Sequence, residues 1–183
     1  MNWTIPNILS VFRLALLPIM VGLFFIPYEW AAWSCLVLYA IGAITDFLDG
    51  YLARKLNQQS EFGAMIDPIS DKIFVVTILL MLVAVERVDG AAVLCVVIIL
   101  TREFIVSGIR EYLGPQGVKM PVTNLAKWKT TLQMVALGVL IVAPYIWGGQ
   151  IIGMLLLLGA TGITAYTGWG YLKKALEFLR KIS

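Results

Sequence analysis

Histidine is absent from the 183-residue chain, and cysteine occurs only twice. Because histidine is the commonest acid–base group near neutral pH and the commonest metal ligand, any catalysis has to rely on carboxylates, lysine, arginine or a bound metal ion. Cys35 and Cys95 both lie in apolar runs. This single pair indicates neither a disulfide framework nor a zinc site.

Charged residues are also scarce, at 14% of the chain, whereas 60% of the residues are hydrophobic. Soluble domains contain about 25% charged and about 45–50% apolar residues, so a soluble core of this length could not bury so much apolar surface. We therefore expect lipid to be the solvent. The formal net charge of +3 is too small to indicate a nucleic-acid partner.

Long apolar runs fill most of the chain, and a helix needs about 20 apolar residues to cross the hydrocarbon core of a bilayer. We expect an all-α, polytopic membrane protein with a single transmembrane domain over residues 1–183. We predict six transmembrane helices, at about 8–27, 31–55, 62–85, 90–113, 125–147 and 150–172.

Basic residues near the ends of these spans predict the orientation, because cytoplasmic connections carry an excess of lysine and arginine. Arg54 and Lys55 lie at the end of the second span, and Arg110 and Lys119 lie near the connection after the fourth. The opposite side carries only Arg87. We expect both termini in the cytoplasm, in a protein of the cytoplasmic membrane. The basic segment after residue 172 is expected to rest on anionic headgroups, and a solvated tail is the alternative.

Four aspartates gather in the segment TDFLDGYLARKLNQQSEFGAMIDPISDK, between two apolar stretches. Because a helix advances about 100° per residue, Asp46 and Asp49 share one helix face, and Asp67 and Asp71 share one face of the next helix. The small residues beside them would let a ligand or a second backbone approach closely. The pattern predicts two carboxylate pairs aimed at a common point.

Such a group of carboxylates repels itself at membrane depth unless something positive lies between its members. The options are protonation, pairing with a basic residue such as Arg54 or Lys72, or binding of metal ions. Oxygen ligands alone suit hard cations such as Mg²⁺ or Mn²⁺, and two such ions typically hold a phosphoryl group. A proton or cation pathway and purely structural pairing are the alternatives.

The segment reads D-x2-D-G-x2-A-R-x8-G-x3-D-x3-D from Asp46 to Asp71. At every specified position this resembles the signature of the CDP-alcohol phosphatidyltransferase family. The resemblance implies transfer of a phosphatidyl group from CDP-diacylglycerol to an alcohol, with release of CMP. It also implies six membrane spans and a homodimer. The basic residues near the span ends place this segment, and with it the active site, at the cytoplasmic membrane face.

The same resemblance implies roles for the motif residues. Two divalent ions, Mg²⁺ or Mn²⁺, would be held on the diphosphate by Asp46, Asp49, Asp67 and Asp71. Asp71 would also act as the base on the acceptor hydroxyl. The CDP-lipid would contact five motif positions, which are Asp49, Gly50, Ala53, Arg54 and Gly63.

The acceptor has to be recognised outside the motif. Arg102 and Arg110 lie eight residues apart in the fourth span, and Lys127 opens the fifth. These cations could surround an anionic acceptor such as a phosphate. Arg110, Lys119 and Lys129 are also explained by the positive-inside rule. That explanation is poor for Arg102, which lies deeper in its span.

Three segments resemble the bacterial branch of the family that uses glycerol 3-phosphate. They are LTREFIVSGIREYLG in the fourth span, LAKWKTTLQMVALG in the fifth, and the N-terminal run IPNILSVFRLALLPI. The resemblance implies phosphatidylglycerophosphate as the product and Arg102, Arg110 and Lys127 as ligands of the acceptor phosphate. Serine or inositol phosphate is the alternative acceptor within the family, and a divalent-cation transporter is the alternative outside it. Asn7 and Arg13 match the N-terminal pattern, and they either help to build the nucleotide or headgroup end or form an interfacial cap.

Overall fold

The computed structural model describes residues 4–55, 61–114, 116 and 124–182. Six α-helices and two short 3₁₀ helices make up the described elements. They are α1 (Ile5–Phe24), α2 (Glu29–Lys55), α3 (Glu61–Ala84), η1 (Gly90–Ala92), α4 (Val93–Leu113), α5 (Asn124–Val142), η2 (Ala143–Tyr145) and α6 (Gly149–Ile182). The all-α prediction is confirmed for this part of the chain, and each predicted span falls on one helix in the predicted order.

Two helix ends differ most from the sequence prediction. Helix α5 ends at Val142 rather than near 147, because Pro144 lacks the backbone N–H that the next turn requires, and a 3₁₀ turn follows. Helix α6 continues without a break to Ile182. The basic C-terminal segment is thus the last part of one long helix.

The described chain divides into two compact units. Unit 1 comprises Met1–Val88 and Leu137–Gln150, and unit 2 comprises Asp89–Ala136 and Ile151–Ser183. Each unit has its own packing and its own set of buried polar residues. The prediction of a single domain over residues 1–183 stays a prediction.

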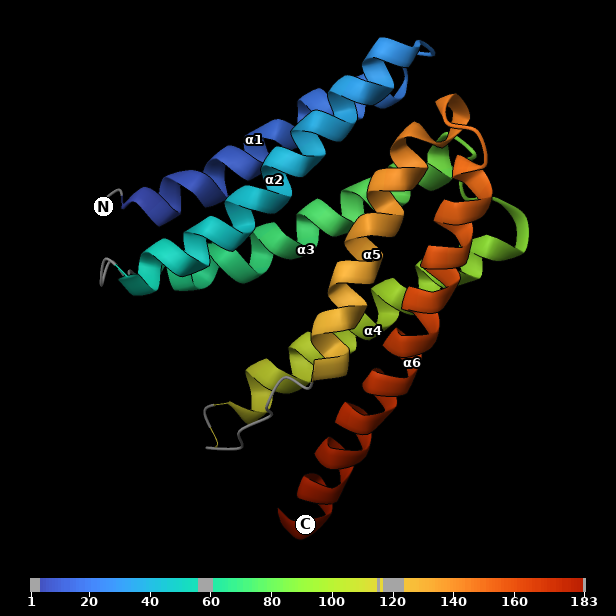
Figure 1. The fold of residues 1–183 in the computed structure, drawn as a ribbon. Helices are drawn as coiled ribbons and strands as arrows, with labels where there is room; N and C mark the ends of the chain where they lie inside the picture. Colours follow the sequence, from blue (N-terminus) through green and yellow to red (C-terminus); the bar gives the residue numbers. More distant parts are fainter. Residues whose placement is uncertain (1–3, 56–60, 115, 117–123, 183) are drawn as a thin grey trace. The chain divides into compact units, whose positions relative to one another are not determined.

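Unit 1 is built around α1, which packs against both α2 and α3 (Figure 1). The Tyr39 ring of α2 stacks on the Phe74 ring of α3, with the ring centroids 5.6 Å apart. Gly42 lies against the same ring, because a Cβ atom at this position would be 2.6 Å from the Phe74 side chain. The absence of a side chain at Gly42 therefore sets how closely α2 and α3 approach, one turn from Asp46 and Asp71.

Unit 2 is held together by contacts of α4 with α5 and α6. The Lys129 ammonium of α5 donates to the Glu103 carboxylate of α4 at 2.9 Å. Arg110 of α4 donates to the Tyr171 hydroxyl of α6 at 2.9 Å. Gly168 of α6 makes room for Arg102, since a Cβ atom there would lie 2.7 Å from the Arg102 Cγ atom. The polar residues of α4 thus point toward the other two helices of this unit.

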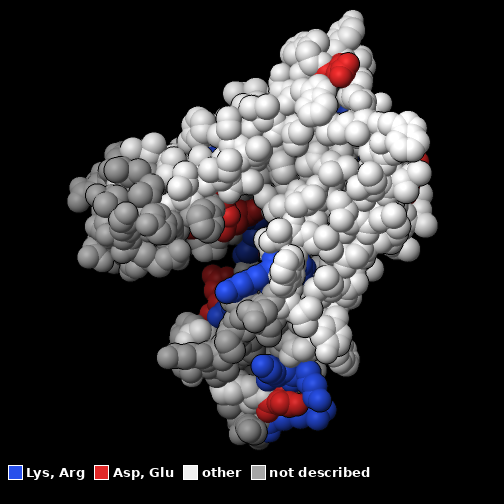
Figure 2. All heavy atoms as spheres, in the orientation of Figure 1, with Lys and Arg blue, Asp and Glu red and all other residues white. Residues whose placement is uncertain are grey.

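Three of the helical segments that the structure describes are long and apolar enough to cross a membrane, namely Asn7–Phe24, Gly90–Leu113 and Gly149–Phe178. The face of the molecule drawn in Figure 2 is largely uncharged. Both cysteines are buried as free thiols, as their apolar surroundings predict.

Candidate functional site

A polar stripe runs along one face of the otherwise apolar helix α1. Asn7, Ser10 and Arg13 follow each other at intervals of three residues, and their exposed fractions are only 2%, 0% and 1%. Burial of an arginine is costly unless a charged partner compensates it. The stripe therefore requires polar or acidic groups opposite it.

Those groups are the motif aspartates. The Arg13 guanidinium forms ion pairs with Asp46 of α2, at 2.6 Å, and with Asp71 of α3. The Ser10 hydroxyl, one turn earlier, donates to the Asp67 carboxylate at 2.6 Å. The structure thus brings three of the four predicted aspartates together at one face of α1.

The remaining motif positions are only partly described. Asp49, Gly50, Ala53 and Arg54 lie on the helical backbone of α2, but their side chains are outside the described residues. Gly63 is buried in the first turn of α3. Pro68 interrupts the hydrogen bonding of α3 directly after Asp67, because proline has no N–H to donate to the preceding turn.

The donor chemistry of the aspartate site fits a hard divalent ion. Asp46 and Asp71 are half-exposed, at 48% and 51%, so an ion could reach their oxygens from solution. Within the described part of the chain, which leaves out the Asp49 side chain, no three acidic, cysteine or histidine side chains are grouped closely enough to hold a metal. Instead, Asp46 and Asp71 share the charge of Arg13.

A second charged cluster lies in unit 2. The Glu103 carboxylate accepts from Lys129 at 2.9 Å and from Arg102 at 3.1 Å, through the same Oε2 atom. Lys129 is only 4% exposed at its side chain. Lys129 is therefore a buried, paired cation rather than a surface charge that only sets the orientation of the chain.

Arg102 and Arg110 meet at one aromatic ring. The guanidinium carbons of Arg110 and Arg102 lie 5.1 Å and 5.8 Å from the centroid of the Tyr171 ring, within the range of cation–π attraction. Arg102 also donates to the Thr167 hydroxyl at 3.4 Å. The structure thus brings together two of the three residues predicted for the acceptor phosphate. Lys127 has an exposed side chain on α5 and takes no part in these particular contacts.

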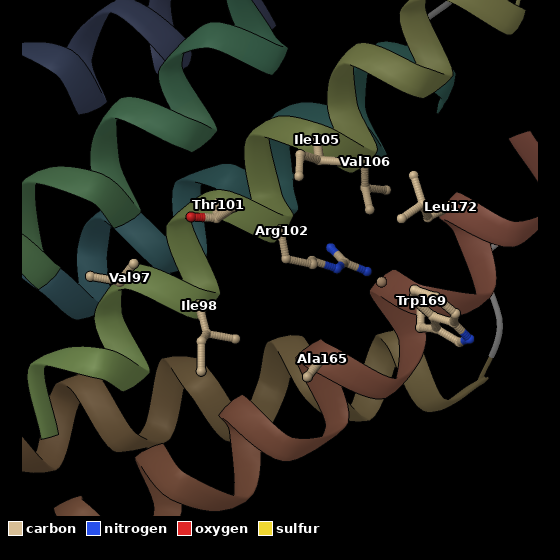
Figure 3. Close-up of a pocket in the computed structure, with 10 residues that line it drawn as sticks. Val97, Ile98, Thr101, Arg102, Ile105, Val106, Ala165, Trp169 and Leu172 are labelled. Atoms are coloured by element: carbon tan, nitrogen blue, oxygen red, sulfur yellow. The ribbon is translucent and has the colours of Figure 1, made fainter. Parts of the chain in front are cut away.

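Arg102 also lines a pocket of about 400 Å³ between α4 and α6. Its side chain reaches from α4 toward α6 and ends near Trp169 (Figure 3). The other lining residues are mostly apolar and include Val97, Ile98 and Leu172. The guanidinium is thus the main charged group at an otherwise apolar wall of unit 2.

A comparison with models of known protein families matches most of the chain to one family. The sequence model for CDP-alcohol phosphatidyltransferases matches residues 3–166. The chain belongs to the CDP-alcohol phosphatidyltransferase family. The motif resemblance is thereby confirmed, and the eight motif positions from Asp46 to Asp71 lie within the matched range.

Individual members of this family are similar over nearly the whole chain. A protein of Cereibacter sphaeroides is 38% identical, with 98% of this chain and 99% of the relative covered. Proteins of Rickettsia typhi and Pseudomonas fluorescens are 41% and 37% identical, covering 92% and 96% of this chain and 95% and 92% of the relatives. All three are named CDP-diacylglycerol–glycerol-3-phosphate 3-phosphatidyltransferase.

The sequence does not predict every residue of the aspartate site and of the charged cluster in unit 2. The sequence leaves the role of Arg13 open between an interfacial cap and a place at the nucleotide or headgroup end, and the structure places Arg13 against the motif aspartates. The three-residue spacing of Asn7, Ser10 and Arg13 was the signal that could have decided this. No local pattern in the sequence of α6 marks Tyr171 and Thr167 as functional residues.

Proposed function

We propose that the protein transfers the phosphatidyl group of CDP-diacylglycerol to glycerol 3-phosphate, giving phosphatidylglycerophosphate and CMP in phospholipid biosynthesis. The observation that carries this proposal is the complete family motif, with Asp46, Asp67 and Asp71 gathered against Ser10 and Arg13 of α1. The names of relatives that are about 38–41% identical over nearly the full chain support the choice of substrates.

The aspartate site is proposed to bind the diphosphate of the CDP-lipid. The family generally uses divalent metal ions, and two Mg²⁺ or Mn²⁺ ions would be held by Asp46, Asp49, Asp67 and Asp71. Bound there, they would neutralise the diphosphate and stabilise CMP as the leaving group. Gly50, Ala53, Arg54 and Gly63, together with Asp49, are proposed to contact the CDP-lipid.

Asp71 is the proposed base. Its carboxylate is half-exposed and is paired with the buried Arg13, which keeps one side of the carboxylate oriented while the other side can meet an incoming hydroxyl. A carboxylate held in this way can accept the proton of the acceptor alcohol as the alcohol oxygen attacks the β-phosphorus of the CDP-lipid. The bond from that phosphorus to the CMP oxygen then breaks.

Arg102, Arg110 and Lys127 are proposed to bind the phosphate of the acceptor. Two of these residues already converge on Tyr171 in unit 2. Guanidinium groups are suited to this task because they present several N–H donors in a planar fork that matches phosphate oxygens. A neutral acceptor such as glycerol would not need these charges.

We also propose that all six helices span the cytoplasmic membrane, with the aspartate site at the cytoplasmic face. Helices α2 and α3 carry exposed apolar residues at helical spacing, namely Val37, Ile41 and Ile44 on α2 and Ile69, Ile73 and Leu80 on α3. Such stripes are suited to contact with lipid. The large exposure of Trp128 and Trp147, at 71% and 99%, fits positions at the membrane interface. The homodimer stays a prediction that rests on the family.

The substrate choice can be tested by measuring CMP release from CDP-diacylglycerol by the purified protein with Mg²⁺ or Mn²⁺. Glycerol 3-phosphate, glycerol, serine, inositol and inositol phosphate would be compared as acceptors. Because charge-assisted hydrogen bonds contribute about 1.5–3 kcal/mol, we expect kcat/KM for glycerol 3-phosphate to exceed that for glycerol by about tenfold or more. Chelation of the metal should abolish release with every acceptor.

Two results would contradict the proposal in different ways. Preferential release with serine or inositol phosphate would keep the reaction but replace the acceptor. Absence of CMP release with all acceptors, together with uptake of divalent cations into liposomes that contain the protein, would favour the transporter instead.

A further inference from the structure

Arg102 and Arg110 pose an electrostatic problem, because like charges on one side of α4 repel each other. A free anion site nevertheless needs both charges to remain available. Pairing each arginine with a carboxylate would hold it in place but would cancel its charge. In the structure Arg102 shares the Glu103 carboxylate with Lys129, and Arg110 instead contacts Tyr171.

The Tyr171 ring attracts both guanidinium groups without carrying a charge. Its centroid lies 5.1 Å from the Arg110 guanidinium carbon and 5.8 Å from that of Arg102. Its hydroxyl accepts a hydrogen bond of 2.9 Å from Arg110 Nη2. Tyr171 is only 6% exposed, so packing fixes the ring itself. A buried neutral side chain of α6 therefore organises two cations of α4.

The remaining partners leave the cluster positive. Glu103 is shared between Arg102 and Lys129, and Thr167 gives Arg102 a neutral acceptor. Three cations with a single carboxylate carry a net charge of +2 among these described side chains. A phosphate monoester carries about −1.5 to −2 near neutral pH, so it would balance this charge.

We propose that Tyr171 is a positioning residue for the acceptor phosphate, holding Arg102 and Arg110 in place while leaving their charges available to a phosphate monoester. This inference rests on the proposed function, because it assumes that these arginines bind the acceptor. It assigns the placement of the two phosphate-binding arginines to a neutral aromatic residue outside the family motif.

The test is steady-state kinetics of Tyr171→Phe and Tyr171→Leu with each substrate varied in turn. Tyr171→Phe removes the hydrogen bond to Arg110 but keeps the ring, so we expect the KM for glycerol 3-phosphate to rise roughly 3- to 10-fold. Tyr171→Leu removes the ring as well and should raise it by roughly 10- to 100-fold. The KM for CDP-diacylglycerol should stay within about twofold, since its proposed ligands lie in the motif.

The matched controls are Tyr166→Phe and Tyr166→Leu, because Tyr166 lies on the same helix and is 73% exposed. Both should leave all kinetic constants unchanged. A readout that needs no turnover is calorimetric binding of glycerol 3-phosphate to the purified protein, where Tyr171→Phe should weaken affinity by the same factor as the KM. In an Arg110→Ala background, Tyr171→Phe should have no further effect.

The outcomes separate this inference from the proposed function. If Arg110→Ala leaves the KM for glycerol 3-phosphate unchanged, the proposed acceptor site is wrong. If Arg110→Ala raises that KM and Tyr171→Phe does not, the acceptor site stands and the positioning role of Tyr171 is wrong. Equal increases in the KM values of both substrates in Tyr171→Phe would show a general structural effect and would also overturn the role.

Discussion

Arg13 is the residue whose position most changes the interpretation of the aspartate motif. Composition and spacing predicted that four carboxylates need a positive partner, and the structure supplies one from α1 in addition to any metal. The single guanidinium is 1% exposed and pairs with both Asp46 and Asp71. The buried cation therefore lowers the repulsion between two helices that each carry aspartates at this site.

Replacing Arg13 by methionine should destabilise the protein most when divalent ions are removed. The change leaves Asp46 and Asp71 facing each other without their shared cation, at a cost of about 1–3 kcal/mol. For a chain of this size that corresponds to a fall in Tm of about 2–4 °C per kcal/mol. Mn²⁺ should restore part of this loss, because an ion that binds only the folded state stabilises it.

Thermal unfolding of the detergent-purified protein, in EDTA and in Mn²⁺, measures this difference. Arg180→Met, at an exposed position of α6, is the matched control and should leave Tm unchanged under both conditions. An identical fall in Tm for Arg13→Met with and without Mn²⁺ would mean that Arg13 and the ion do not act on the same carboxylates.

The contact between α2 and α3 depends on a small residue. Gly42 allows the Phe74 ring to lie against the α2 backbone, where it also stacks on Tyr39. Phe74 is 2% exposed, so the ring has little room to move away from an added methyl group. Asp46 and Asp71 lie one turn from this contact, and helix spacing there determines how the two carboxylates approach each other.

Gly42→Ala should therefore destabilise the protein by about 1–3 kcal/mol through overpacking. We also expect kcat/KM to fall, because a shift of α2 relative to α3 displaces the aspartates. Gly22→Ala is the control, since nothing lies within 4 Å of a Cβ atom at that position in α1. This control should be neutral or slightly stabilising, because alanine favours helix. Equal Tm values for the two variants would contradict the packing argument.

The order of the helices and the membership of the motif could be predicted from the sequence, because both follow from local periodicity. Long apolar runs mark the helices, and intervals of three and four residues place each pair of aspartates on one helix face. The end of α5 was predictable in principle from Pro144. Helix α6 continues past 172 because the segment that follows contains good helix formers and no proline.

Contacts between helices far apart in sequence could not be predicted in the same way. Arg110 and Tyr171 are 61 residues apart, and no spacing rule relates α4 to α6. The contact of Arg13 with Asp71 joins α1 to α3 across 58 residues. These pairings depend on which helix faces meet in three dimensions. The local sequence pattern indicates which polar residues belong to a site, but it does not determine which residues of other helices they contact.

The whole molecule is proposed to be a membrane enzyme with its two substrates recognised by different sets of residues. The motif on α2 and α3 would hold the CDP-lipid, and the cations of α4 and α5 would hold the acceptor phosphate. The long apolar helices and their exposed apolar side chains fit a protein that works in a bilayer. The central claim is that the aspartate site performs the chemistry.

CMP release from CDP-diacylglycerol and glycerol 3-phosphate by purified Asp71→Asn tests this claim most directly. The amide keeps the size of the side chain but cannot take the proton, so we predict a loss of kcat of about 100-fold or more. The variant should still fold, because Arg13 keeps its ion pair with Asp46. Asp89→Asn makes the same change at an exposed carboxylate outside the site and should retain full activity. Near-normal turnover by Asp71→Asn would contradict the account.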